Sequence, residues 1–449
     1  MRTFPGRSPS PRPSGHRQIA NVLIGVALLI AGCSTERNPS TQTASALKPI
    51  DQAALQSLVD TTTEELLIPG ALVLLRTPRG DFTAASGTTQ LGARKRPGAD
   101  THFRIASNTK TMTAAVVLQL AQEGNGRLRL SDPVSKYVPG VPNGDEITVA
   151  QLLEMRSGLY NYTDAPELAA TIDRDATKVW TPAELLAIAF AHAPNFPPGS
   201  QYEYNNTNYA LLGLIIETVD GRPLATAMQQ RLFEPLGMQH TMLPAGTSNS
   251  LPEPYSHGYL YGSSSVALYG APPYSTEEKA AARAGTLEPI DYTGVNHSFA
   301  AAAGGVISNA TDLATWIRAL VTGRVLDAEY QRRWRVSLQP EDPSKPGQKY
   351  GYGIAQVRWG PNTIYFHGGE TVGYNSKISY DSTNQVTLIV WTNLPVSLDE
   401  QQTANTLWLK VLDQIYVVSP LQADTTHRER RPASDGFRVS ERITGKRRA

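Results

Sequence analysis

The sequence predicts an α+β domain in which an antiparallel sheet, flanked by terminal helices, carries a largely helical inserted subdomain. Two segments near the start, 71–77 and 82–86, have strand character, and further strand-like segments lie near the end. The middle, about 125–300, is punctuated by Pro and Gly and has helical stretches instead. The two ends are therefore expected to build one sheet, and a functional site is expected where the insertion meets it.

The individual elements follow from periodicity and from turn residues. In chain order we expect a helix over 51–67, strands over 71–77 and 82–86, a helix over 108–123, helices over 182–192 and 209–218, strands over 350–359, 363–367, 375–380 and 386–391, and a closing helix over 399–417. The segment 108–123 is apolar nearly all round and ends before Gly124, which is typical of a buried helix. Asp381–Gln385 supplies a turn between two of the late strands.

Composition and charge exclude several classes of protein. The chain of 449 residues is 40% apolar, which is enough for a substantial core. The net charge of +1 conceals an acidic body, because residues 19–426 carry 29 basic and 37 acidic residues, a net of −8. Such a body disfavours nucleic-acid binding. One cysteine excludes a disulfide framework, and the eight histidines are scattered, so no metal and no cofactor are expected.

The N-terminus has the pattern of an export signal. Four arginines and no acid in residues 1–18 precede the uncharged run 19–31, which is too short to span a bilayer but suits a signal peptide. Gly32-Cys33 then resembles a bacterial lipobox, which implies cleavage before Cys33, lipidation of its thiol and a membrane-anchored protein outside the cytoplasm. The alternative is a plain secretory signal in which Cys33 is incidental.

These patterns divide the chain into four parts. Residues 1–33 are expected to be the lipoprotein signal peptide with its cysteine, and 34–50 a polar tether. Residues 51–418 form the predicted domain. Residues 419–449 are Arg-rich and polar, and we expect a basic, disordered tail.

The first motif, Ser107-Asn108-Thr109-Lys110, lies at the start of the predicted buried helix. Its serine is a candidate nucleophile and its lysine a candidate base. A serine at a helix N-terminus meets unpaired N–H groups and the positive end of the helix dipole, which stabilise charge on an attacked carbonyl. Lys110, three residues on, shares its face, and burial lowers the pKa of a lysine toward that of a useful base. The alternative is that Ser107 is an N-cap, and a second S-x-x-K at Ser45–Lys48 shows how weak the motif is alone.

Two more motifs follow on loops or strands. Tyr204-Asn205-Asn206 lies between a Pro-Gly turn and a helix, a place from which side chains reach a cleft. His367-Gly368-Gly369 lies on a predicted strand, where glycine allows the backbone of a ligand to approach closely. The alternatives are a surface aromatic at Tyr204 and a strand-end turn at His367.

In this order the three motifs resemble those of the serine penicillin-recognising hydrolases, the family of class C β-lactamases, the actinomycete D-alanyl-D-alanine carboxypeptidase and related esterases. The resemblance covers about 51–415 and includes the segments 147–159 and 303–316. It implies a β-lactamase/penicillin-binding-protein-like fold. It also implies that Ser107 is the nucleophile that forms an acyl-enzyme, with Lys110 and Tyr204 as its activating and proton-shuttling partners; either of these two remains open as the base.

The resemblance further implies a set of substrate-binding groups. Asn206 is expected to hydrogen-bond the amide of the substrate, and His367 and Gly369 belong to the third motif. The backbone N–H groups of Ser107 and Glu370 are expected to form the oxyanion hole.

The third motif departs from the family pattern. Gly368 stands where a hydroxyl residue usually binds the carboxylate of the substrate, and Glu370 would repel that carboxylate unless paired. Arg156 and Tyr160 are candidates to restore anion binding. We therefore expect an extracytoplasmic D-alanyl-D-alanine carboxypeptidase- or β-lactamase-like serine hydrolase acting on a small molecule or a peptidoglycan peptide. The alternatives are an esterase or neutral-amide hydrolase, and a low-turnover penicillin-binding-type lipoprotein that senses the wall.

Overall fold

The computed structural model describes residues 47–270 and 274–417. The predicted signal peptide with Cys33, most of the tether and the basic tail lie outside these residues. Within the described ranges, no helix combines the length and the apolar character needed to cross a membrane.

The described residues form an antiparallel sheet of eight strands in the order β2-β1-β12-β11-β10-β9-β8-β7. Its strands are β1 (Gly70–Thr77), β2 (Gly80–Gly87), β7 (Gln339–Asp342), β8 (Lys345–Tyr350), β9 (Ala355–Trp359), β10 (Asn362–Thr371), β11 (Tyr374–Asp381) and β12 (Val386–Thr392). Two short pairs lie apart from it: β3 (Phe103–Arg104) with β6 (Ile307–Ser308), and β4 (Tyr259–Leu260) with β5 (Ile290–Asp291). Because β12 pairs with β1, the two ends of the domain share one sheet, as predicted.

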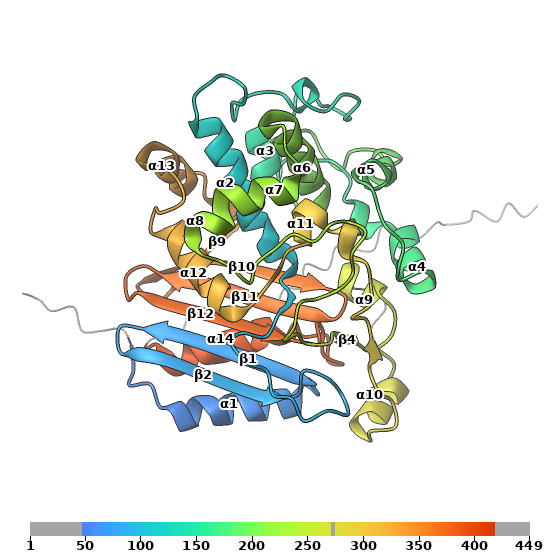
Figure 1. Cartoon of the computed structure of the whole chain (residues 1–449), viewed down its shortest axis with the longest axis vertical. Coiled ribbons are helices and arrows are strands. Elements are labelled where there is room, and N and C mark those ends of the chain that lie inside the picture. The colour runs from blue at the N-terminus through green and yellow to red at the C-terminus, as the bar shows by residue number, and fades with distance from the viewer. Residues whose placement is uncertain (1–46, 271–273, 418–449) are drawn as a thin grey trace, which may run out of the picture. The chain divides into compact units, whose positions relative to one another are not determined.

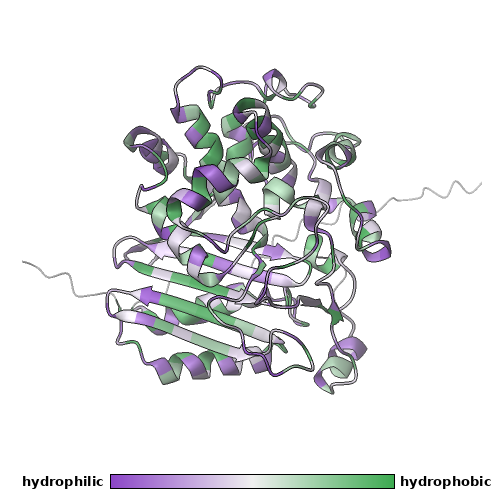
Figure 2. Cartoon of the chain, viewed as in Figure 1, coloured by the Kyte–Doolittle hydropathy of each residue, from purple (hydrophilic) through white to green (hydrophobic). Residues whose placement is uncertain are grey.

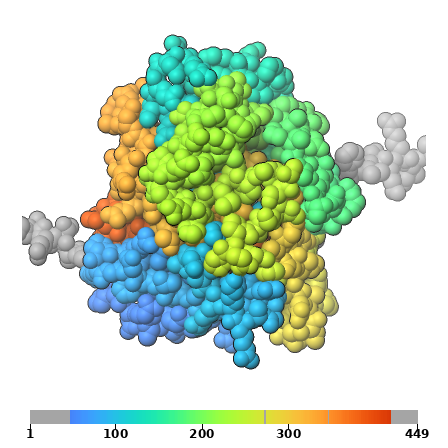
Figure 3. All heavy atoms as spheres, in the orientation of Figure 1, coloured from blue at the N-terminus to red at the C-terminus, as the bar shows by residue number. Residues whose placement is uncertain are grey.

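Helices cover the sheet and fill the insertion. Helices α1 (Gln52–Glu65) and α14 (Thr403–Ile415) pack on one face, and α12 (Ala310–Val321) packs on the other (Figure 1). The other helices are α2 (Thr109–Gln122), α3 (Val149–Leu153), α4 (Pro166–Arg174), α5 (Pro182–Phe190), α6 (Asn206–Asp220), α7 (Leu224–Met228), α8 (Glu234–Leu236), α9 (Ser265–Leu268), α10 (Thr276–Arg283), α11 (Ala301–Gly304) and α13 (Ala328–Val336). The teal and green middle segments lie above the blue N-terminal segments (Figure 3). An antiparallel sheet covered by helices, with most of the other helices in the middle of the chain, confirms the predicted α+β class.

Helix α2 is buried on all sides, as its sequence predicts. Every residue in it except Gln119 and Gln122 is buried, and it packs against α6 and α11 (Figure 2). A helix that is apolar all round has no solvent face, so it lies in the core. The core helix therefore carries the start of the first motif into the interior of the domain.

The expected single strand over 350–359 is wrong. The chain turns between β8 and β9, where Gly351 N–H donates to Ile354 O at 2.9 Å and Gly353 has a φ of +70°. Glycine adopts that left-handed conformation without strain, so the two glycines permit a tight hairpin in place of a continuous strand. The hairpin brings Tyr350 beside the third motif.

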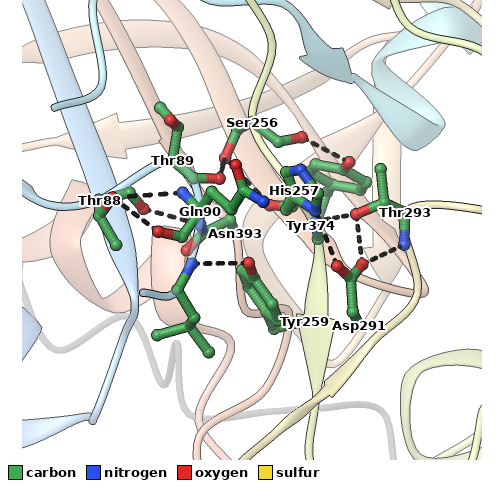
Figure 4. A network of polar contacts seen from close by, with 12 residues as sticks. Thr88, Thr89, Gln90, Ser256, His257, Tyr259, Asp291, Thr293, Tyr374 and Asn393 are labelled. Atoms are coloured by element: carbon green, nitrogen blue, oxygen red, sulfur yellow. Dashed lines mark hydrogen bonds and ion pairs between the residues drawn. The ribbon is translucent and has the colours of Figure 1, made fainter. Parts of the chain in front are cut away.

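A polar junction joins the insertion to the sheet (Figure 4). Asn393, which follows β12, accepts from Gly70 N–H at 2.6 Å and donates to Thr88 O at 3.1 Å and to Ser256 Oγ at 3.2 Å. Tyr374, at the start of β11, donates to Ser256 O at 2.8 Å. These bonds satisfy buried backbone groups where the segment before β4 crosses the sheet, so they fix the insertion relative to the β10–β11 hairpin.

The folded domain begins before the predicted boundary at residue 51. Leu47 forms a β-bridge with Tyr416, and Lys48 N–H donates to Ile415 O at 2.8 Å. The last residues of the segment expected as a tether (34–50) therefore belong to the domain, because Leu47 is buried against the end of α14.

Candidate active site

Ser107 lies in a single 3₁₀ turn, η1 (Ala106–Asn108), that leads directly into α2. Ala106 before it has a φ of +49°, a conformation that costs a non-glycine residue of order 1–3 kcal/mol. Neither η1 nor α2 has a side-chain cap, so the N-cap alternative for Ser107 is wrong. Among the described residues no acceptor is bonded to the Ser107 N–H, so this donor remains available to a ligand.

Lys110 lies at the centre of the site and is fully buried. Its Nζ lies 2.9 Å from Ser107 Oγ, 2.7 Å from Asn206 Oδ1 and 2.8 Å from Ala303 O. Burial lowers the pKa of Lys110 well below its ordinary value. The first motif thus has the contact and the electrostatic environment that its spacing predicts.

The three partners of Lys110 determine how its neutral form is oriented. Asn206 Oδ1 and Ala303 O accept hydrogen bonds and cannot donate. A neutral amine has two N–H bonds, which these two acceptors take, and its lone pair then points at Ser107 Oγ. This arrangement favours Lys110 as the base between the two candidates that the sequence leaves open.

Tyr204 lies beside the lysine, on the loop that leads into α6. Lys110 Nζ is 4.8 Å from the centre of the Tyr204 ring, a cation–π distance. The ring also lies 6.3 Å from the rings of Tyr350 and His367. The structure therefore brings together Ser107, Lys110 and Tyr204 from two of the three motifs, and places His367 next to them.

Asn206 has a different environment from the one expected of a substrate-binding amide. Its Oδ1 accepts from Lys110, and its Nδ2 donates to Thr163 Oγ1 at 2.8 Å. Its backbone N–H donates to Asn161 Oδ1 at 2.9 Å. Both ends of the side chain are thus bonded within the protein, and in this structure Asn206 positions Lys110.

His367 is buried on β10 and neutral. Burial and the nearby charge of Lys110 lower the pKa of His367 to about 3. Its Nδ1 lies 2.6 Å from Gly368 O, and since a carbonyl only accepts, Nδ1 carries the proton. Its Nε2 then accepts from Tyr350 OH at 3.0 Å; burial holds the pKa of this tyrosine well above its ordinary value, so its hydroxyl keeps the proton.

At Gly369 the absence of a side chain lets another part of the protein come close to the β10 backbone. A Cβ at this position would lie 2.1 Å from Ile105 O and 2.9 Å from Asn108 Nδ2. The turn η1, which carries the candidate nucleophile Ser107 and is called the nucleophile turn, therefore packs directly on the β10 backbone. On this face of Gly369 the space is filled by the turn of Ser107, so the approach of a ligand to the edge of the strand stays a prediction.

Glu370 lies on the other face of the sheet from that turn. Neighbouring residues of a strand point to opposite faces, and the Glu370 carboxylate accepts from Gln402 Nε2, before α14, at 2.6 Å. The backbone N–H of Glu370 points to the open side of β10.

The two-residue turn after Thr371 makes Thr371–Tyr374 a hydrogen-bonded pair of the hairpin. Because such pairs alternate, the next pair, Glu370–Asn375, is non-hydrogen-bonded, and the Glu370 N–H points away from β11.

The edge of β10 toward which the Glu370 N–H points has no paired strand next to the third motif. Strand β9 pairs with β10 only as far as Phe366. Among the described strands, the part of β10 from His367 to Thr371 therefore has β11 as its single neighbour. An open edge beside a nucleophile can pair with an extended substrate.

Arg156 and Tyr160, the candidates for anion binding, have other contacts. Arg156 donates to Pro340 O at 3.0 Å, and its guanidinium lies 6.0 Å from the centre of the Tyr202 ring. Tyr160 stacks on His192, with 3.9 Å between the ring centres. Both side chains pack against the protein, so the structure gives no support to an anion site made by this pair.

Sequence reasoning missed three groups of the site. Ala303 acts through its backbone carbonyl and Thr163 through a single hydroxyl, and neither has a signal that separates it from its neighbours. Tyr350 stood at the first residue of a strand that was expected to run straight on to 359. Only the hairpin turn after Tyr350, which its flanking glycine favours, brings the hydroxyl to His367.

The fold and the Ser107–Lys110–Tyr204 cluster define a serine hydrolase of the penicillin-recognising kind. The chain belongs to the Beta-lactamase family, whose profile matches residues 55–413. Among solved structures, the D-stereospecific amidohydrolase from Streptomyces sp. is similar, with a TM-score of 0.68 and 32% identity over 80% of this chain and 99% of that chain. The D-amino acid amidase from Ochrobactrum anthropi SV3 has a TM-score of 0.66 and 25% identity over 80% of this chain and 96% of that one.

Curated relatives include penicillin-binding-like proteins. The putative penicillin-binding protein PbpX of Bacillus subtilis (strain 168) is 27% identical over 69% of this chain and 66% of its own length. The protein flp of Staphylococcus aureus (strain MW2) is 33% identical over 199 residues, which are 41% of this chain and 38% of that protein. The chain thus spans less than two fifths of the length of that relative.

We predict that Gly369→Ala abolishes the reactivity of Ser107 while the domain stays folded. The added methyl would meet a backbone oxygen at 2.1 Å, which pushes the nucleophile turn off β10, and displacement of a catalytic group by about 1 Å costs on the order of 100-fold in rate. The measurement is the rate of covalent labelling by a fluorophosphonate, followed by intact-protein mass. Gly368→Ala is the matched control, because the nearest atom to its methyl is Lys377 Cδ at an ordinary 3.6 Å. Equal labelling of the two variants would contradict the close-packing argument.

Proposed function

We propose that this protein hydrolyses amide bonds next to D-amino acid residues through an acyl-enzyme on Ser107, as D-alanyl-D-alanine carboxypeptidases do. The observation that carries the proposal is the Lys110 Nζ held 2.9 Å from Ser107 Oγ by two acceptors that cannot donate. A serine hydroxyl is a weak nucleophile unless a base is within hydrogen-bond reach, and Lys110 is such a base.

In the first half of the reaction, neutral Lys110 takes the proton of Ser107 as Oγ attacks the carbonyl carbon. The carbonyl oxygen becomes an oxyanion that accepts from the N–H groups of Ser107 and Glu370, and each such donor is typically worth about 3 kcal/mol in the transition state. The C–N bond then breaks, and the proton passes through Lys110 and Tyr204 to the leaving amine. An ester of Ser107 remains.

In the second half, water attacks that ester. Lys110 accepts the proton of the water, and Ser107 Oγ leaves and takes the proton back, so the enzyme returns to its starting state. The acid product departs. Lys110 thus acts as the base in both halves.

The open edge of β10 and the similarity to known amidases and penicillin-binding proteins support this substrate class. An extended peptide can pair with β10 at His367–Thr371, which places one of its carbonyls toward Ser107. The similar structures are named for action on D-configured amides, and the curated relatives include a putative penicillin-binding protein. A β-lactam and an ester present the same reacting carbonyl, so β-lactamase and esterase activity are the alternatives.

We expect the purified full-length protein to gain one adduct with a fluorophosphonate, and one with a penicillin, in intact-protein mass. Ser107→Ala should gain neither, because the nucleophile is lost. Ser45→Ala, in the second S-x-x-K, is the matched control and should be labelled like the wild type. The wild type should also release alanine from a D-alanyl-D-alanine peptide and leave the L-alanyl-L-alanine peptide intact.

Other outcomes of this experiment favour the alternatives. A fluorophosphonate adduct without a penicillin adduct or peptide cleavage would favour the esterase. A penicillin adduct that persists, with no turnover of any substrate, would favour the low-turnover penicillin-binding sensor. Labelling that survives in Ser107→Ala would contradict the proposed nucleophile.

We predict that kcat/KM falls as the pH is lowered, and that this acid limb reports the protonation of Lys110. Burial lowers the pKa of Lys110, and only its neutral form takes the serine proton, so activity rises as pH rises through that pKa. His367, with a pKa of about 3, stays neutral across the range. Glu154 is the other candidate, because burial raises its pKa to about 7. The measurement is the pH profile of Glu154→Gln and His367→Gln, whose limb should keep its wild-type position; a shifted limb would assign it to the substituted residue.

The location of the enzyme is proposed from Cys33. A lipid on this cysteine would hold the domain at the outer side of the cytoplasmic membrane, where peptidoglycan peptides occur. We expect Cys33→Ser to move the protein from the membrane fraction to the soluble fraction of expressing bacteria, because serine has no thiol to acylate. Membrane association that is unchanged in Cys33→Ser would contradict the lipid anchor.

A further inference from the structure

One short segment, Asn161–Thr163, contacts both parts of the chain that supply the acceptors of Lys110. It runs into the 3₁₀ turn η3 (Tyr162–Asp164), and its three side chains are buried. Asn161 Nδ2 donates to Asp164 Oδ1 at 2.9 Å, and the Asp164 N–H donates to Asn161 O at 2.9 Å, so the segment is closed on itself. None of the three sequence motifs includes it.

The first acceptor, Asn206 Oδ1, is fixed through the other polar atoms of its residue. Thr163 Oγ1 accepts from Asn206 Nδ2 at 2.8 Å, and Asn161 Oδ1 accepts from the Asn206 backbone N–H at 2.9 Å. Because the amide group is planar, a bond that holds Nδ2 on one side directs Oδ1 to the other, where it lies 2.7 Å from Lys110 Nζ. Thr163 thus keeps the accepting atom of Asn206 toward the lysine.

The second acceptor, Ala303 O, lies on α11, and Tyr162 holds the chain just before that helix. Tyr162 OH donates to Phe299 O at 2.6 Å, at the end of the 3₁₀ turn η5 (His297–Phe299) that leads into α11. Burial raises the pKa of Tyr162, so its hydroxyl keeps the proton and remains a donor. The Tyr162 N–H in turn donates to Thr207 Oγ1 on α6 at 3.1 Å.

The position of the two acceptors decides what Lys110 can do to Ser107. While both are in place, they take the two N–H bonds of neutral Lys110, and its lone pair points at Ser107 Oγ. If one acceptor moves away, an N–H bond can turn toward Oγ instead, and a lysine that donates to the serine cannot take its proton. Each acceptor also stabilises the ammonium more than the amine, because hydrogen bonds from charged donors are stronger.

We infer that the Asn161–Thr163 segment positions the base of this enzyme, with Thr163 and Tyr162 as the residues that hold the two acceptors of Lys110. The inference rests on the proposed function and adds positioning residues to it, which act on the reaction through Lys110. Replacing them is therefore expected to change the reactivity of Ser107 and the protonation of Lys110 together.

Other titratable side chains lie around Lys110, on α6, β8 and β10 and on the loop before α6. The rings of Tyr204 and Tyr209 lie 4.8 and 5.6 Å from Lys110 Nζ, and His367 and Tyr350 lie beside Tyr204. Burial raises the pKa of Tyr209 and of Tyr350 and lowers that of His367 to about 3, so these three keep their charge around neutral pH. An acid limb that moves when the segment is changed is therefore assigned to Lys110.

The test is the rate of covalent labelling of Ser107 by a fluorophosphonate, measured against pH on full-length variants, because labelling needs an activated serine but no particular substrate. Thr163→Val keeps the shape of the side chain and removes the hydroxyl. It should lower the labelling rate about 10-fold on the plateau of the pH profile. Because the ammonium of Lys110 loses an acceptor, its pKa falls, and the acid limb should move to lower pH by up to about one pH unit.

Three further variants separate positioning from packing. Tyr162→Phe removes only the hydroxyl that binds Phe299 O, and it should lower the rate and move the limb in the same direction. In the double variant with Thr163→Val the losses should be less than additive, because both act through one amine. Thr163→Ser keeps the hydroxyl and should restore the wild-type profile. Thr171→Val removes a hydroxyl that accepts from Arg174 at 3.3 Å on an exposed part of α4, and as the matched control it should behave as the wild type.

Two results would overturn the inference while the proposed function stands. One is a labelling rate that is unchanged in both Thr163→Val and Tyr162→Phe. The other is a lower rate with an unmoved acid limb in folded variants, as checked by circular dichroism, which would mean that the segment only packs the insertion. A wild type that is labelled at no pH would overturn the proposed function, and this inference with it.

Discussion

The site is organised by the burial of one amine, because three segments of the chain meet at Lys110 Nζ. Its three hydrogen-bond partners come from η1, from the start of α6 and from α11. An amine buried with no solvent contact is costly unless each of its hydrogen bonds is satisfied. These segments are therefore constrained to converge at this point, and Asn161 and Thr163 bind Asn206 for the same reason.

The second constraint is the contact between the nucleophile turn and β10. At Gly369 the turn touches the strand backbone with no side chain between, and Asn108 Nδ2 also donates to Ser376 Oγ on β11 at 2.8 Å. This contact fixes Ser107 relative to the N–H of Glu370. In the proposed mechanism the sheet thus supplies one N–H of the oxyanion hole and the turn of Ser107 the other, so the geometry of the site depends on how closely the two pack.

Sequence analysis can predict those parts of the site that are side chains a few residues apart in the chain. Ser107 and Lys110 are one helical turn apart, so their contact follows from the helix alone. A glycine such as Gly369 indicates that something packs closely on the strand, but not whether this is a ligand or, as here, the turn of Ser107. Ala303 and Thr163 have no local signal at all, since their contacts with Lys110 and Asn206 arise only when distant segments of the chain pack together. The wrong prediction of one strand over 350–359 has a local cause, because the residues on both sides of a glycine turn have strand character and the turn was taken as part of the strand.

The bridge between Leu47 and Tyr416 has a consequence for how this domain is used. The two ends of the described domain leave it from adjacent points, although nearly the whole fold lies between them in the chain. A domain with adjoining ends can be placed inside a longer polypeptide without disturbing its sheet, because the flanking segments enter and leave at one place. In this fold, then, new regions can be added at either end while the catalytic geometry is left unchanged.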